Sequence, residues 1–262
     1  MPRYLSIYRM FVANQLKTLA IHRADFVVGV ICLLLSFIAI RFSIWAIFER
    51  TQNIGGWVKG EILFMYGYNL VAAGTAWFFF NKAWSLRDTI VSGGFLRYKI
   101  RPINPAFHFF AESMDARSLV TILLGVVTLR GASAAIGYSW EPARVAEMLV
   151  LAGLSATLLA GLIVLMSGLA FWVTISNPLL SLLSSVYGIA HFPVGIYGNP
   201  MQLFLSTLIP IAFLSFYPCS LLLGKTASFT PVYVMLAMIA GIWVAGAVLW
   251  RRGVQRYELS AT

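Results

Sequence analysis

The chain has 262 residues, of which 60% are hydrophobic and only 11% are charged. Soluble domains carry roughly 25% charged residues, so this chain has too little charge to coat a soluble core of its size. The net charge of +10 does not indicate nucleic-acid binding, because the basic residues lie between long apolar runs. The composition therefore predicts an all-α integral membrane protein with no nucleic-acid partner.

Residues 1–25 are predicted to form an amphipathic helix on the membrane surface. Apolar residues recur at helical spacing, with basic residues among them, at Leu5, Tyr8, Val12, Leu16 and Leu19. The segment does not read as a signal peptide, because its basic start does not lead into an apolar core with a small-residue cleavage site. The alternative is an irregular basic tail.

Several apolar runs reach about 20 residues, the length that crosses a hydrocarbon layer. The predicted spans are residues 26–48, 62–80, 118–137, 145–172, 178–197 and 231–250. A seventh run, residues 201–223, contains Pro210 and Pro218, and each proline breaks a helix. We expect this run to form a re-entrant hairpin from the outer face, preceding the last span. In the alternative, 201–223 is a kinked span and 178–197 crosses only in part.

The basic residues bear on the number of crossings. Segments 1–25, 81–117 and 251–262 hold 4, 6 and 3 of them, which is 13 of the 19 Lys and Arg residues. Cytoplasmic segments are enriched in Lys and Arg, so all three are expected on the cytoplasmic side. That placement requires an even number of crossings. The sequence therefore predicts one domain, residues 1–262, with six spans and both termini in the cytoplasm.

No catalytic, cofactor or metal site is expected. The nine acidic residues lie at span ends or in polar loops, which argues against an ion-coupled carrier or an intramembrane protease. The two cysteines and three histidines show no metal-binding spacing. The stretch "CSLLLGKT", 219–226, ends like a phosphate-binding loop, but Cys219 replaces its first glycine and no strand is expected before it. Lys225 is expected instead to anchor a helix end at the membrane interface.

Three residues are candidates for a transport pathway. Trp77 and Phe78 belong to an aromatic group at the end of the second span, and such residues either anchor the span or line a path for a flat, hydrophobic substrate. Arg130 lies about 18 Å along the third span, and either faces a cavity or partner or extends outward to the interface. The fourth span carries small residues for close helix packing, within one subunit or between two, at Gly153, Thr157 and Gly161.

The order of these features resembles the membrane subunits of ABC-2 type exporters, the type V exporter architecture. The cytoplasmic loop carries Ile90, Gly93 or Gly94, Leu96, Arg101, Pro102, Asn104 and Pro105. A second motif before the last span is Ile209, Pro210, Ala212, Phe213, Tyr217 and Pro218, and a basic-Tyr ending is Arg251, Arg256 and Tyr257. The likeness covers nearly the whole chain, although the family often has glycine where this chain has Glu258.

The resemblance implies that residues 81–117 couple the chain to an ATPase. A short helix over about 83–91 would dock there, and glycines at 93 and 94 would end it. Pro102 in "RPINP" would then force an extended turn. The charged residues of this coupling loop are Arg87, Asp88, Arg97, Lys99 and Arg101. The alternative is a loop that is basic only because it is cytoplasmic.

The resemblance also implies a division of labour. A separate ATP-binding subunit would dimerise beneath the membrane, while two permease chains, identical or paralogous, form the path. This chain would therefore have no nucleotide site of its own, and would reside among the lipids of a bacterial cytoplasmic membrane. Its cargo is expected to be amphipathic or hydrophobic. A membrane scaffold that transports nothing is the alternative function.

Overall fold

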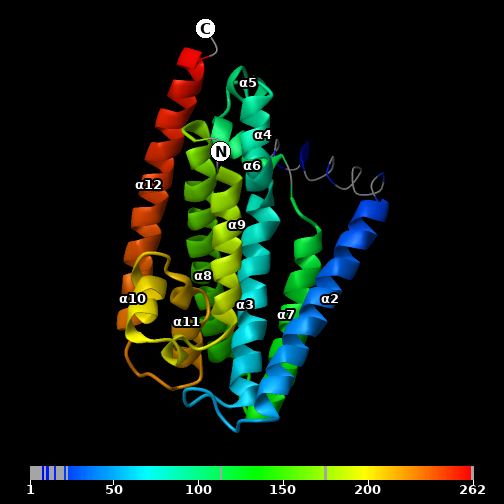
Figure 1. Ribbon diagram of the computed structural model, residues 1–262, viewed down its shortest axis with the longest axis vertical. Coiled ribbons are helices and arrows are strands. Elements are labelled where there is room, and N and C mark those ends of the chain that lie inside the picture. The colour runs from blue at the N-terminus through cyan, green and yellow to red at the C-terminus, as the bar shows by residue number, and fades with distance from the viewer. Residues whose placement is uncertain are drawn as a thin grey trace.

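The computed structural model describes residues 8, 10, 11, 15, 21, 23–112, 114–173 and 176–260. Within these residues the chain is helical and has no strand. The helix predicted over residues 1–25 falls mostly outside this part of the chain. Five described helices are long and apolar enough to cross a membrane (Figure 1): α2 (Arg23–Phe48), α3 (Lys59–Phe80), α7 (Arg117–Ile136), α8 (Pro142–Gly168) and α12 (Thr230–Ser260).

Helix α3 lies at the centre and packs against α7 in the antiparallel sense (Figure 1). The two backbones approach closely at Gly67, where an added Cβ would lie 2.8 Å from the Leu129 amide nitrogen. Gly125 on α7 faces back, and an added Cβ there would lie 2.8 Å from the Gly67 carbonyl oxygen. Glycine is required at these positions because any side chain would separate the helices.

Helices α8 and α12 run in the same direction. Gly161 lies against Trp243, and about two turns further along Gly168 lies against Trp250. Trp250 is fixed by its indole N–H, which donates to the Val164 carbonyl oxygen at 3.0 Å. Because both helices finish at the same end of the bundle, the chain between them must return to the opposite end.

The end of the bundle at which α8 and α12 finish also holds residues 81–117, and it is called the basic end below. Four short helices cover it: η1 (Asn81–Ser85), α4 (Leu86–Val91), α5 (Leu96–Lys99) and α6 (Pro105–Ala111). The connection from α2 to α3 lies at the opposite end (Figure 1). The 3-10 turn η2 (Leu169–Phe171) extends α8 into the basic end.

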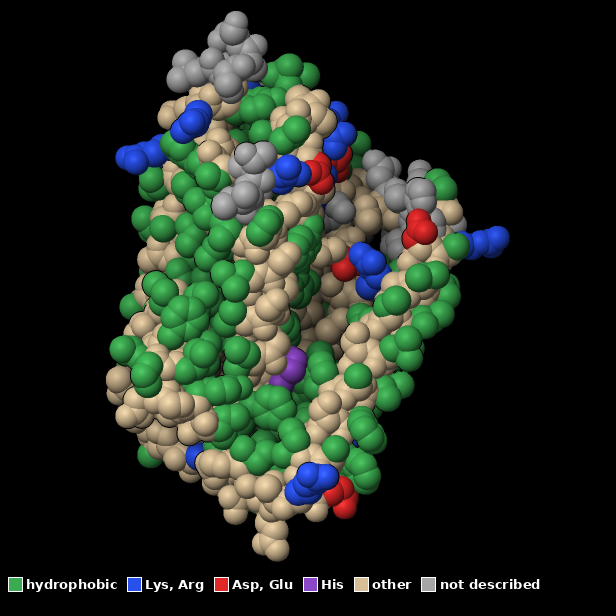
Figure 2. Space-filling model, in the orientation of Figure 1, with side chains coloured by type: hydrophobic (Ala, Val, Ile, Leu, Met, Phe, Trp, Pro, Cys, Tyr) green, Lys and Arg blue, Asp and Glu red, His purple; other side chains and the backbone are tan. Residues whose placement is uncertain are grey.

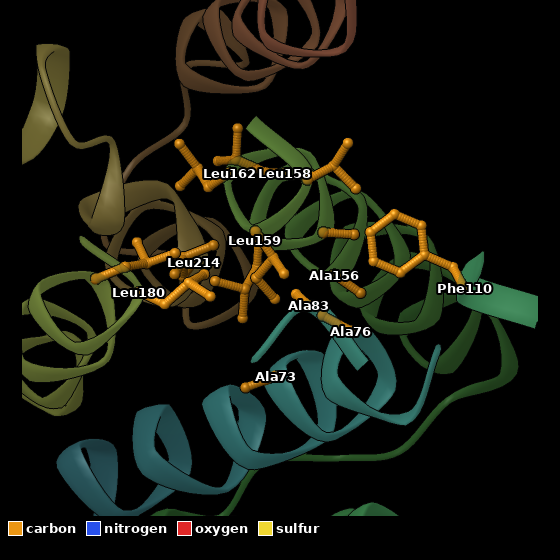
Figure 3. Close-up of a cluster of buried hydrophobic side chains, with 14 of the residues drawn as sticks. Ala73, Ala76, Ala83, Phe110, Ala156, Leu158, Leu159, Leu162, Leu180 and Leu214 are labelled. Carbon is orange, nitrogen blue, oxygen red and sulfur yellow. The ribbon is translucent and has the colours of Figure 1, made fainter. Parts of the chain in front are cut away.

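Small and large apolar side chains share the core around α8 (Figure 3). Ala73 and Ala76 of α3 give this side of the core its small residues, and Leu158 and Leu162 lie on the side of α8 away from α3. Further along the chain, Leu180 and Leu214 complete the same cluster. Close packing of this kind holds membrane helices together, since lipid is as apolar as the side chains.

The segment after α8 divides into short helices. The predicted span 178–197 contains α9 (Ser176–Tyr187), η3 (Gly188–His191) and η4 (Val194–Ile196), with Pro193 between the two 3-10 turns. The predicted hairpin contains α10 (Asn199–Thr207), η5 (Ile211–Leu214) and α11 (Phe216–Leu222). No single helix in either segment is long enough to cross, so among the described residues five spanning helices stand where the sequence predicted six.

Candidate functional site

The basic end is held together by an aromatic cluster. Phe95 and Tyr98 are fully buried although they lie in a segment rich in charge. The Phe95 ring lies 5.0 Å from that of Phe171 and 5.5 Å from that of Tyr257, measured between centroids. The Tyr257 hydroxyl donates to the Gly93 carbonyl oxygen at 3.1 Å. The loop is therefore fixed to the ends of α8 and α12.

A glycine turn separates α4 from α5. Gly93 has φ of +73°, in the left-handed region, whereas Gly94 does not have a positive φ. The Ser92 amide donates to the Asp88 carbonyl oxygen at 2.9 Å and the Phe95 amide donates to that of Thr89 at 3.0 Å. These bonds satisfy the carbonyls at the end of α4. Of the two glycines expected to end the helix, Gly93 takes the conformation that glycine favours.

Pro102 lies in a bend between α5 and α6. Asn104 caps α6, because its side-chain oxygen accepts from the amides of Ala106 at 3.0 Å and Phe107 at 3.2 Å. Pro105 occupies the first helical turn, where its missing N–H costs nothing. The "RPINP" stretch thus turns the chain from α5 into α6.

A charged cluster lies under the loop. The Lys82 ammonium contacts the Glu112 carboxylate and donates to the Tyr98 hydroxyl at 2.9 Å. Arg97 reaches the same carboxylate at 3.3 Å. Burial acts to raise the pKa of the Glu112 carboxyl, but the hydrogen bonds from Lys82 and Tyr98 outweigh it, and the pKa lies below its usual value. Glu112 and Lys82 are site residues that the sequence did not single out.

The outer surface of the loop combines charged and apolar side chains. Asp88 pairs with Arg87 at 3.0 Å, and the exposed Arg101 lies 3.3 Å from the His108 ring. Lys99 is half-buried on α5. Three large apolar residues are exposed beside these charges: Val91 at 67%, Leu96 at 50% and Ile100 at 75%. These three, with Asp88 and Arg101, form what we call the outer loop face.

The candidate pathway residues are not all brought together. Trp77 stacks on Trp84 and lines a pocket of about 250 Å³ with Asp115 and Arg117, between α2, α3 and α7. The surface is hollowed beside α2 (Figure 2). Phe78 lies next to Trp77 in the chain, with its carbonyl oxygen accepting from the Asp115 amide at 3.1 Å.

Arg130 lies away from this pocket. It is exposed on α7, thirteen residues from Arg117, which is about 20 Å along a helix. The structure therefore separates Arg130 from the aromatic pair that the sequence grouped with it.

The proline-containing segment packs into the opposite half of the bundle. Pro210 precedes η5 and Pro218 lies in the first turns of α11. The Tyr217 hydroxyl lies 3.2 Å from the Ser206 hydroxyl of α10, which joins the two helices of the segment. The Ser155 hydroxyl of α8 donates to the Phe213 carbonyl oxygen at 3.2 Å, so the turn η5 is fixed to the body.

Two polar contacts in this half of the bundle join residues that the sequence analysis did not pair. The Asn69 amide lies 2.9 Å from the His191 ring nitrogen Nδ1, and both side chains are buried. Lys225 pairs with Glu61 at 2.9 Å and donates to the Gly56 carbonyl oxygen at 3.0 Å. Lys225 thus ties the chain before α12 to the start of α3.

Long apolar helices closed at one end by a charged, aromatic-anchored loop define a polytopic membrane protein. The family described as ABC-2 family transporter protein matches residues 16–261, so the chain belongs to this family. Its members are the membrane subunits of transporters, which work with an ATP-binding subunit. No curated protein and no solved structure matches the chain.

Proposed function

We propose that this chain is the permease of an ATP-driven exporter, and that the outer loop face docks on the ATPase. The observation that carries the proposal is the exposure of Val91, Leu96 and Ile100 next to charged residues, on a segment anchored from behind by Phe95 and Tyr98. Apolar side chains exposed in water are typical of protein interfaces. Closure of the ATPase would then move a loop that is rigidly joined to α8 and α12.

The coupling residues in this proposal are Arg87, Asp88, Gly93, Gly94, Arg97, Lys99, Arg101 and Pro102, joined by the three apolar residues of the outer loop face. The Gly93 turn and the Pro102 bend set the shape of the surface, and the charged side chains would fix the orientation in which the ATPase binds. Two permease chains form the path, and the cargo is amphipathic or hydrophobic. Trp77, which lines the pocket beside α2, is the leading pathway candidate, and Phe78 is its neighbour in the chain.

The proposed topology has six crossings and cytoplasmic termini in a bacterial inner membrane. The parallel arrangement of α8 and α12 supports it, because residues 172–229 must then cross once in net terms. We assign that crossing to α9, η3 and η4, and the re-entrant hairpin to residues 201–223, which include Pro210, Tyr217 and Pro218. The excess of basic residues at the basic end supports its cytoplasmic placement.

The docking surface is tested by Ile100→Glu. This change places a charge at the most exposed apolar position of the outer loop face, and we expect at least about tenfold less ATPase to co-purify with the chain, as for other interface residues of high energy. Asp88→Arg should weaken co-purification by a smaller factor because Asp88 is an exposed charge. Gln52→Glu, at the opposite end of the bundle, is the control. Equal recovery of the ATPase with all three variants would contradict docking at this surface.

The alternative is a membrane scaffold that transports nothing. Purification from the native host distinguishes the two functions. An exporter permease retains an ATPase whose hydrolysis rate changes when the chain is present, and a scaffold does not.

A further inference from the structure

Two adjoining pockets lie along α12 near the basic end. The first has a volume of about 320 Å³ and the second of about 400 Å³. Ala106, Val164 and Trp243 line both, so the two pockets form one continuous groove between α6, α8 and α12. Each volume falls within the roughly 300–1,000 Å³ that small-molecule sites occupy.

The first pocket is lined by apolar and aromatic side chains, and the Tyr8 hydroxyl among them donates to the Met114 sulfur at 3.8 Å. Phe79, Phe80 and Phe110 line it beside Trp243. The Trp243 indole N–H donates to the Thr157 carbonyl oxygen at 3.1 Å. The ring therefore presents an apolar face to the pocket, which suits hydrocarbon and leaves no hydrogen bond to offer a polar ligand.

Small residues hollow out the second pocket. Ala106, Gly246 and Ala247 line it, where larger side chains would fill it. A Cβ added at Gly246 would meet its nearest atom, Cγ1 of Val164, at 3.6 Å, an ordinary contact. A larger side chain at Gly246 is therefore accommodated at its base and occupies the groove beyond it.

The groove ends at a positive charge. Arg251 lines the second pocket, with Asn104 and Gln255 nearby, and no acidic side chain among the described residues lines either pocket. The apolar run of α12 ends at Trp250, so Arg251 lies where a membrane passes from hydrocarbon to headgroups. Eight residues separate Trp243 from Arg251, or about 12 Å along the helix.

We propose that this groove binds one anionic phospholipid of the adjacent leaflet. An acyl chain lies against the rings of Trp243 and Phe110, and the phosphate lies beside Arg251. Apolar walls, a basic mouth and the absence of acidic lining residues together match an amphiphile with an anionic head. This lipid is a bound constituent of the permease and not its cargo, so the site is independent of the proposed export function.

Native mass spectrometry of the full chain, purified with its partner subunits, tests the site. The probes are palmitoyl-oleoyl phosphatidylglycerol and the phosphatidylcholine with the same chains. We expect the wild type to retain phosphatidylglycerol preferentially. Gly246→Leu, which fills the groove, should weaken that binding about tenfold, and Arg251→Gln about fivefold, the effect of removing one basic contact at a membrane surface.

Gly241→Leu is the matched control, because Gly241 lies on the same helix with nothing within 4 Å of its added Cβ. It should bind phosphatidylglycerol like the wild type. Equal binding of the two lipids by the wild type would overturn the proposal, as would equal binding by Gly246→Leu and Gly241→Leu. Cross-linking of this groove to a second permease chain or to the ATPase would identify it as a protein interface and also overturn the lipid assignment.

Discussion

Glu112 illustrates how a single residue stabilises the basic end. The Lys82 ammonium beside it is largely buried, with its side chain 12% exposed, and Glu112 is the carboxylate that neutralises it. The Lys82 ammonium also lies 5.0 Å from the centroid of the Phe109 ring. A buried charge is costly unless it is paired, and the cation–π contact does not replace the carboxylate, so loss of Glu112 leaves the Lys82 ammonium without its counter-ion.

We therefore predict that Glu112→Gln lowers the free energy of unfolding by about 1–2 kcal/mol at pH 7. Because folding lowers the pKa of Glu112, its contribution is present above the unfolded-state pKa and is lost as the pH falls through the folded-state pKa. The gap in melting temperature between wild type and variant should thus be largest near neutral pH and narrow below about pH 4. Asp88→Asn is the control, because the Asp88 carboxylate is exposed and pairs with Arg87 at the surface. If Asp88→Asn lowered the melting temperature as much as Glu112→Gln, burial of the Lys82–Glu112 pair would not explain the effect.

At the scale of elements, the contact between α3 and α7 depends on glycine. We predict that Gly125→Ala destabilises the bundle by about 1–3 kcal/mol, because the new methyl group must displace the backbone of α3 at Gly67. Thermal unfolding in detergent measures the effect. Gly131→Ala, on the same helix with open space around it, should leave the melting temperature unchanged or raise it. Similar losses in the two variants would contradict the role of close helix approach at Gly125.

The apolar runs predicted the long helices near their observed positions, because the length of an apolar run is visible from neighbouring residues alone. The sequence did not reveal which small residues pack. Gly161, Gly153 and Thr157 share one spacing, yet Gly161 contacts Trp243 while Gly153 has open space around it. The sequence also did not reveal the aromatic cluster at the basic end, because Phe95 comes near Phe171 and Trp250 only in the folded chain. Contacts between distant segments leave no periodic signal in the chain.

For the whole molecule, the direction of the helices and the distribution of charge lead to the same topology. Helices α8 and α12 end together at the basic end, where the Tyr257 hydroxyl bonds to the Gly93 carbonyl oxygen. Residues 81–117 and the last turns of α12 thus lie at the same end of the bundle, and the proposed topology places both on one side of the membrane. In the proposed arrangement either residues 178–197 or residues 201–223 make the sixth crossing, and exchanging the two leaves the total number of crossings even.

We therefore predict a paired labelling pattern in a chain whose two cysteines are replaced by alanine, Cys32→Ala and Cys219→Ala. Single cysteines introduced by Ser92→Cys and Gln255→Cys should react with a membrane-impermeant maleimide only after cells are permeabilised, since both positions lie at the basic end. Those introduced by Gln52→Cys and Ser228→Cys, in the connections before α3 and α12, should react in intact cells. If Ser92→Cys and Gln255→Cys label from different sides, the number of crossings between them is odd. The segment between α8 and α12 then does not cross, and the proposed arrangement of six spans is wrong.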